Sequence, residues 1–148
     1  MVVEQQASRA GTDRAASLVE LLTVAQRRVA RGVAGALAED GATLDVFRLM
    51  RCLAAGPGRS MGELGVALSL PAPTLTRLVD GLVDGAEAYR LPDPDDGRRV
   101  RVHLSARGRT RLARLEALVR AHEDGLAAVL GADRVAALAR ALTGFEPA

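Results

Sequence analysis

Apolar residues recur at every third or fourth position through most of the chain, which is the spacing of one face of an α-helix. Between these segments stand residues that start or stop helices, such as Gly56-Pro57-Gly58 and Gly131. The sequence Ser60-Met61-Gly62-Glu63 fits a capping box, in which the serine hydroxyl and the glutamate carboxylate each bind a free N–H group. The pattern predicts helices over residues 14–37, 43–55, 60–68, 73–83, 106–130 and 133–142.

One segment follows a different period. Residues 99–104 alternate basic with apolar side chains, which is the pattern of a β-strand with two unlike faces. Prolines, aspartates and a glycine in residues 92–97 predict a turn before it. Residues 87–91 are therefore expected to pair with 99–104 as a hairpin. Its apolar face would carry Val100, Val102 and Leu104, and its other face Arg99, Arg101 and His103.

Positive charge is concentrated on this hairpin. Seven arginines and three aspartates lie between Arg90 and Arg111, a net charge of +4, whereas the whole chain is only +2. All the basic residues are arginine, whose forked and permanently charged group suits phosphate and guanine. A local basic patch of this kind indicates a polyanionic partner such as DNA.

The composition indicates one soluble domain. In 148 residues, 49% are apolar but only 2% are aromatic, so the core is expected to consist of Leu, Val and Ala. The single cysteine, Cys52, excludes an intrachain disulfide. No apolar run approaches the length of a membrane span, and the N-terminus lacks the layout of a signal peptide. A cytoplasmic location is expected.

The order of elements is that of a winged helix-turn-helix: a short helix, a tight turn, a helix with a polar outer face, then a basic hairpin. A helix of this kind fits the major groove of DNA, and its polar residues meet base edges there. An arginine at the hairpin tip suits the narrower, more negative minor groove. The expected fold class is mostly α with a small β-hairpin wing.

Five stretches, at matching spacing, resemble the MarR family of regulators. The most diagnostic is the aspartate-rich turn followed by Arg-Arg, a valine-rich strand and Leu-Ser-x-x-Gly. The stretches are Thr43-Leu44-Asp45-Val46-Phe47, Glu63-Leu64, Thr74-Leu75-Thr76-Arg77-Leu78-Val79-Asp80, Asp93-Pro94-Asp95-Asp96-Gly97-Arg98-Arg99 and Leu104-Ser105-Ala106-Arg107-Gly108.

The resemblance implies a homodimeric DNA-binding regulator, most simply a repressor, that binds a pseudo-palindromic operator. It implies a division into a mobile tail (1–13), an N-terminal dimerisation helix (14–40), a DNA-binding lobe (41–105) and C-terminal dimerisation helices (106–148). It also implies a small effector molecule between the lobe and the dimerisation helices, and the scarcity of aromatic residues favours an apolar effector or none.

The resemblance further assigns major-groove reading to residues 73–80 and minor-groove entry to Arg98 or Arg99, with Asp96 holding the wing arginine by a charge-assisted bond. The full set of predicted DNA-binding residues is Ser60, Pro73, Thr74, Thr76, Arg77, Asp80, Asp96, Arg98, Arg99 and Arg101. The chain departs from the family pattern by placing Ser69 and Ala86 where glycine is common, Pro71 where serine caps the next helix, and Glu87-Ala88 where the wing usually begins with Leu-Val.

Other interpretations remain open at this stage. The polar helix face and the wing arginines could be solvated surface, or the module could bind a protein. Arg107, Arg109 and Arg111 begin a helix, where they would meet either an external anion or nearby aspartates. Cys52 reads as a buried thiol, with a thiol-responsive regulator as the alternative. His122 is interpreted as a core or interface residue, with contact to a ligand as the alternative. No catalytic set, metal-ligand spacing or cofactor motif is present, so an enzyme is not expected.

Overall fold

A computed structural model describes residues 17–144 of the protein. Its elements are α1 (Leu18–Ala38), α2 (Leu44–Ala54), β1 (Arg59–Ser60), α3 (Met61–Leu68), α4 (Ala72–Asp84), β2 (Ala88–Pro92), β3 (Val100–Leu104), α5 (Ala106–Leu130) and α6 (Ala132–Thr143). The predicted class, mostly α with a small β-hairpin, is confirmed. The tail predicted for residues 1–13, the start of the first predicted helix at residues 14–16 and the last four residues lie outside the described range.

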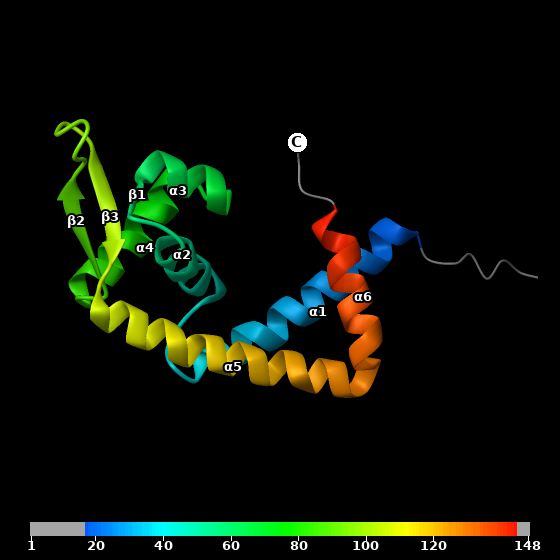
Figure 1. The fold of residues 1–148 in the computed structure, drawn as a ribbon. Helices are drawn as coiled ribbons and strands as arrows, with labels where there is room; N and C mark the ends of the chain where they lie inside the picture. The colour runs from blue at the N-terminus through cyan, green and yellow to red at the C-terminus, as the bar shows by residue number, and fades with distance from the viewer. Residues whose placement is uncertain (1–16, 145–148) are drawn as a thin grey trace, which may run out of the picture.

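The elements form two parts, which Figure 1 shows side by side. The lobe comprises α2, α3, α4 and the three strands, and it lies at the N-terminal end of α5. The arm comprises α1, α5 and α6. Helix α1 crosses α5, and α6 folds back from the far end of α5. The chain passes between lobe and arm at two places only, the α1–α2 turn and the β3–α5 connection.

Short polar side chains start four of the helices. Ser17 and Ser60 form complete capping boxes with Glu20 and Glu63, and Ser60 was the one predicted. Thr43 and Ser105 each accept a backbone N–H in the first turn of α2 and α5. The predicted starts of α2, α3 and α5 lie within one residue of the observed ones. The start predicted at residue 14 was wrong, because the Ser17 cap begins α1 at Leu18. Pro71 precedes α4 and provides no side-chain cap, as expected where proline replaces the serine of the family pattern.

The sheet is antiparallel with strand order β1-β3-β2. The hairpin pairs Ala88 with Leu104 and Pro92 with Val100, without interruption. Its first strand begins one residue later than predicted, because the Glu87 N–H group is bonded back to Leu82 at the end of α4. Strand β1, which pairs Ser60 with Arg101, was not predicted.

The core lies within the lobe and extends only a short way along the arm. Its fully buried side chains are mostly Leu and Val, as the composition predicted, with Met50 among them: Leu37, Leu49, Met50, Leu53, Leu64, Leu75, Val79, Val102 and Leu115. The apolar stripes of the arm helices are buried only near the lobe. Leu18, Leu21 and Val29 on α1 are exposed, as are Val129, Leu130, Leu138 and Leu142 on α5 and α6.

Within residues 17–144, two residues other than glycine adopt left-handed backbone angles. Ser69, which ends α3, has a φ of 53°, and Ala86, which follows α4, has a φ of 55°. Both positions are ones at which the sequence lacks an expected glycine. A Cβ atom makes this conformation unfavourable by roughly 1–2 kcal/mol. The turns on both sides of α4 are therefore strained by these two side chains.

Within residues 17–144, no helix is both long enough and apolar enough to cross a lipid bilayer.

Candidate nucleic-acid interface

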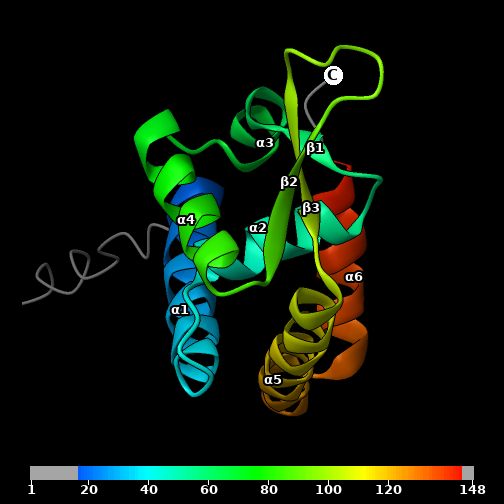
Figure 2. The ribbon, with the colours of Figure 1, turned by 90° about the vertical axis from the view of Figure 1, so that its left-hand side faces the viewer.

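Helix α4 has one buried and one exposed face. Leu75, Val79 and Leu82 are buried against the lobe. Thr76, Arg77 and Asp80 are exposed on the other side, with Pro73 exposed and Thr74 half-buried in the first turn. The Thr76 hydroxyl donates to the Ala72 carbonyl at 2.9 Å. The predicted polar face is confirmed. Helix α4 contacts β2, and Figure 2 shows the helix and the hairpin in the same lobe.

The tip of the hairpin is organised by Asp96. Its Oδ1 accepts the backbone N–H of Arg98 at 3.1 Å, and its Oδ2 lies 3.3 Å from Nε of Arg99. The predicted bond between Asp96 and a wing arginine is therefore present, and the arginine is Arg99. The side chains of Arg98 and Arg99 are largely exposed, so the tip presents two guanidinium groups to solvent.

Arg101 is directed differently from these two arginines. Its Nε donates to Asp93 Oδ2 at 2.6 Å, and its Nη1 donates to the Gly58 carbonyl at 3.1 Å. A third partner, Glu63, lies 3.8 Å away, and only 28% of the arginine side chain is exposed. The Arg101 guanidinium, which was predicted to contact DNA, thus bonds protein groups instead and connects the wing to the start of α3.

Asp93 is buried at the base of the turn. It accepts the backbone N–H of Asp95 at 2.9 Å as well as the Arg101 bond. These two bonds, the backbone one foremost, hold the pKa of Asp93 below its ordinary value, and Asp93 in turn raises the pKa of Arg101. Asp93 lies in the turn predicted for residues 92–97, but its pairing with Arg101 was not predicted.

Ser60 lies where β1 meets α3. Its hydroxyl accepts the Glu63 N–H at 3.2 Å, and its own N–H donates to Glu63 Oε2 at 2.7 Å. The latter bond is the main reason that the pKa of Glu63 is lowered. Ser60 is half-buried and also pairs with Arg101 across the sheet. Its side chain is therefore engaged as a helix cap.

Asp80, another predicted DNA-binding residue, already has a partner. Its Oδ1 accepts a bond of 2.6 Å from Arg90 of β2. The pair links the exposed face of α4 to the wing, and both side chains remain substantially exposed. Arg90 had been counted in the arginine cluster but not singled out, because only the fold brings it against α4.

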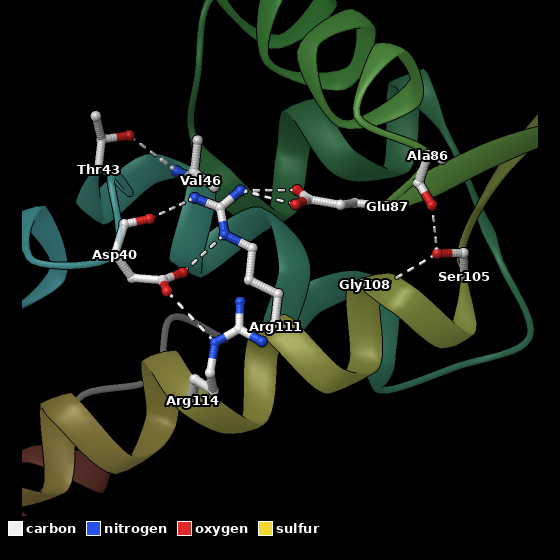
Figure 3. Close-up of polar contacts among 9 residues, drawn as sticks. All are labelled: Asp40, Thr43, Val46, Ala86, Glu87, Ser105, Gly108, Arg111 and Arg114. Atoms are coloured by element: carbon white, nitrogen blue, oxygen red, sulfur yellow. Dashed lines mark hydrogen bonds and ion pairs between the residues drawn. The ribbon is translucent and has the colours of Figure 1, made fainter.

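At the base of the lobe, Arg111 bonds two acidic residues (Figure 3). Its Nε donates to Asp40 Oδ2 at 3.0 Å, and its Nη1 donates to Glu87 Oε2 at 2.8 Å. The bond from Arg111 is the main reason that the pKa of Asp40 lies below its ordinary value. Of the two alternatives for the arginines that begin α5, Arg111 therefore takes the structural one, with Glu87 as an additional and unpredicted partner.

A cleft of about 210 Å³ lies between α2 and α5. Four of its six lining side chains are charged: Phe47, Arg51, Glu116, Val119, Arg120 and Glu123. The guanidinium of Arg51 lies 5.7 Å from the centre of the Phe47 ring. The position matches the expected effector site between lobe and arm, but the lining differs from the Leu, Val and Ala walls that composition suggested.

The structure also places Cys52 and the two histidines. Cys52 is a free, half-buried thiol on α2. His103 stacks on Tyr89 with ring centres 5.2 Å apart. His122 is half-buried on α5 and its ring lies directly over Gly32 of α1. Within residues 17–144, no three His, Cys, Asp or Glu side chains gather closely enough to hold a metal ion.

Comparison with known proteins agrees with this geometry. The sequence profile of the MarR family matches residues 40–99. The HTH-type transcriptional repressor Rv2887 of Mycobacterium tuberculosis is 34% identical over 100 residues, which cover 68% of this chain and 72% of that protein.

Two solved structures extend the comparison to the fold. The repressor CouR bound to a 23-mer DNA duplex matches with a TM-score of 0.79 and 32% identity, covering 86% of this chain and 91% of that one. Rv2887 in complex with salicylic acid matches with a TM-score of 0.75 and 30% identity, covering 91% of this chain and all of that one. The chain therefore belongs to the MarR family of transcriptional regulators.

Proposed function

We propose that the protein is a homodimeric transcriptional repressor that binds a pseudo-palindromic DNA operator. The observation that carries this proposal is the exposed polar face of α4 beside a hairpin whose tip presents Arg98 and Arg99. The two surfaces belong to one lobe, so they can enter neighbouring grooves of the same duplex. The repressors Rv2887 and CouR, the latter solved on a DNA duplex, support this assignment.

The major-groove contacts are assigned to the exposed residues of α4. Pro73 and Thr74 lie in the first turn, the part of a recognition helix that enters the groove most deeply. Arg77 suits guanine or phosphate, and the methyl group of Thr76 suits the thymine methyl. Asp80, held by Arg90, orients that arginine toward the backbone of the duplex and reads no base itself.

The minor-groove contact is assigned to Arg98 and Arg99, with Asp96 keeping the tip in shape. Arg101 and Ser60 support this contact indirectly. Arg101 is bonded to Asp93 and Gly58, and Ser60 caps α3, so both fix the angle between wing and helix. The ten residues predicted from sequence thus divide into those that face the DNA and those that hold them in place.

A second copy of this chain is the proposed cover for the apolar stripes of the arm. Exposed leucines and valines lie on α1 and on the α5–α6 end, away from the lobe. Large apolar side chains gathered on exposed helices in this way mark an interface. Two lobes carried by one symmetric pair of arms would match the two half-sites of a pseudo-palindrome.

The α2–α5 cleft is the proposed effector site. Arg51 and Arg120 offer charge to an acidic group, and Phe47 offers a ring to stack on. The related Rv2887 was solved with salicylic acid, a small aromatic acid. A ligand that binds one arrangement of lobe and arm better than another would shift the population and weaken operator binding.

The experiment that tests the proposal is fluorescence anisotropy with DNA from upstream of the protein's own gene and with a random duplex. The wild type should bind the upstream DNA tightly and with a steep dependence on salt, because arginines displace counterions from phosphates. The Arg98→Ala/Arg99→Ala variant should lose most of this affinity. The control, Arg140→Ala, removes a charge from the side of α6 away from Leu138 and Leu142 and should bind as the wild type does.

Binding that is indifferent to salt, and equal in wild type and wing variant, would contradict DNA recognition and favour a protein-binding module instead.

A further inference from the structure

A single guanidinium group joins three separate segments of the fold. Arg111 extends from the second turn of α5, as Figure 3 shows. Its Nη1 bonds both carboxylate oxygens of Glu87, at 2.8 and 3.0 Å. Its Nε bonds the Asp40 carboxylate at 3.0 Å, and its Nη2 bonds the Asp40 carbonyl at 2.9 Å. We name these three residues the junction cluster.

The junction cluster lies where lobe and arm are connected. Asp40 belongs to the α1–α2 turn, which is one of the two covalent connections. Glu87 lies between α4 and β2, so it belongs to the lobe immediately after the recognition helix. Arg111 belongs to the arm. Any rotation of the lobe relative to α5 would therefore stretch the bonds of this guanidinium.

Backbone contacts extend the connection to the end of α4. Ser105, at the second covalent connection, donates from its hydroxyl to the Ala86 carbonyl at 2.8 Å and from its N–H to the Glu87 carbonyl at 2.9 Å. Glu87 in turn donates its N–H to Leu82, within the last turns of α4. The orientation of α4 is thus defined directly against the start of α5.

The chemistry of the junction cluster favours a positioning role over a stabilising one. Glu87 is only 8% exposed, and burying a carboxylate costs solvation that an apolar residue of similar size would not lose. The guanidinium of Arg111 bonds Glu87 through Nη1 and Asp40 through Nε and Nη2, so its rigid plane fixes the directions of these bonds, as apolar packing would not. Arg114 supports the arrangement from the next turn, with its Nε 3.4 Å from Asp40.

We propose that the junction cluster fixes the angle between lobe and arm, and thereby the separation at which the two recognition helices of a dimer meet their half-sites. The proposal rests on the proposed function, since it needs a dimer on a pseudo-palindrome. Asp40, Glu87 and Arg111 are positioning residues in this scheme, and none of them needs to touch DNA.

The test measures selectivity for half-site spacing. A duplex is first selected from a random library with the wild-type protein, and two further duplexes are made with one base pair added or removed between the half-sites. Glu87→Gln removes one charge at nearly constant shape, and Arg111→Lys keeps the charge but loses the fork. Asp45→Asn, which breaks an exposed ion pair with Arg48 inside α2, is the control. Thermal unfolding and sedimentation velocity establish that each variant is folded and dimeric.

The wild type and Asp45→Asn should bind the altered spacings much more weakly than the selected one. In Glu87→Gln and Arg111→Lys, the ratio of the Kd for altered spacing to the Kd for selected spacing should fall by about fivefold or more. An unchanged ratio in both variants, with or without a lower Tm, would overturn the proposal and leave the junction cluster a stabilising contact. Failure of the wild type to select any duplex would overturn the proposed function as well.

Discussion

The carbonyl oxygen of Glu87 occupies the space into which a side chain at position 108 would project. Gly108 lies in the first turn of α5, and its N–H donates to the cap residue Ser105 at 3.0 Å. The absence of a side chain there lets the start of β2 lie directly on α5. Helix and strand approach each other more closely at this point than any other residue would permit.

Gly108→Ala is expected to destabilise the protein, although alanine is the better helix former. The added Cβ would meet backbone at Glu87 and the side chain of Leu104, and the backbone cannot move away easily. Overpacking of this kind costs about 1–3 kcal/mol in the free energy of unfolding. Gly81→Ala is the matched control, because nothing lies within 4 Å of a Cβ there, and it should stabilise α4 by about 1 kcal/mol. Urea unfolding of both variants measures the difference; equal stabilisation would contradict the close approach.

Glycine at either strained turn residue should stabilise the protein. Ser69→Gly and Ala86→Gly relieve left-handed backbone angles, and each is expected to raise the free energy of unfolding by about 0.5–1 kcal/mol. Ala55→Gly, at a helix end with a φ of −77°, should instead lower it by a similar amount. Thermal and urea unfolding compare the three variants. If Ser69→Gly and Ala86→Gly both lowered the free energy of unfolding, the two native side chains would contribute more to stability than their backbone strain removes.

Stability should fall in acid because several carboxylates are held ionised by the fold. Folding lowers the pKa of Asp93, mainly through the Asp95 N–H bond and next through Arg101, so the contribution of this carboxylate is complete above about pH 4. It is lost as the pH falls through the lowered pKa. Asp93→Asn should therefore be less stable than the wild type at pH 7, with the gap closing toward pH 2.

Asp124→Asn, at an exposed position on α5, is the control for that titration and should follow the wild-type curve throughout. Denaturant midpoints at several pH values provide the measurement. A gap between wild type and Asp93→Asn that persists undiminished at pH 2 would show that the carboxylate acts through its shape and not through its charge.

Charge placed on the arm should separate the proposed dimer. Leu21→Arg on α1 and Leu138→Arg on α6 each put a guanidinium on an apolar stripe that a second copy would cover. Both variants should sediment as monomers at micromolar concentration. Val66→Arg on α3 is the control, since Val66 is 84% exposed but belongs to the lobe, and it should remain dimeric. A wild type that is itself monomeric, or arm variants that stay dimeric, would contradict this interface.

Most helices could be predicted because their signals are local. Apolar periodicity, the caps at Ser60 and Ser105, and the stop at Gly131 all lie within a few residues of the boundaries that they define. The predicted bounds of the long helix, residues 106–130, are those of α5. The two faces of β3 also followed from alternation, since Val102 and Leu104 are buried. Val100, which pairs with Pro92 at the end of the hairpin ladder, is 46% exposed.

Contacts between distant segments could not be predicted. Strand β1 has two residues, too few to show any period, and it exists only because β3 lies beside it. The bond between Arg111 and Asp40 joins residues 71 positions apart. From sequence alone, an external anion was an alternative partner for Arg111. Arg101 occupies the same face of the alternating pattern as Arg99. The turn, however, brings Asp93 against its guanidinium, so Arg101 bonds within the protein and is not exposed as Arg99 is.

The pairing of β1 with β3 has a consequence for the DNA sequences that the protein can recognise. Because β3 is the central strand and β1 leads directly into α3, the wing arginines cannot be re-aimed without moving the helices beside them. In the proposed complex, the number of base pairs between the bases that α4 contacts and the point where the wing enters the minor groove is then the same for each lobe. Every operator of this protein should place a narrow, A·T-rich stretch at one fixed distance, in base pairs, from its central bases. Natural operators can then differ in base sequence but not in that distance.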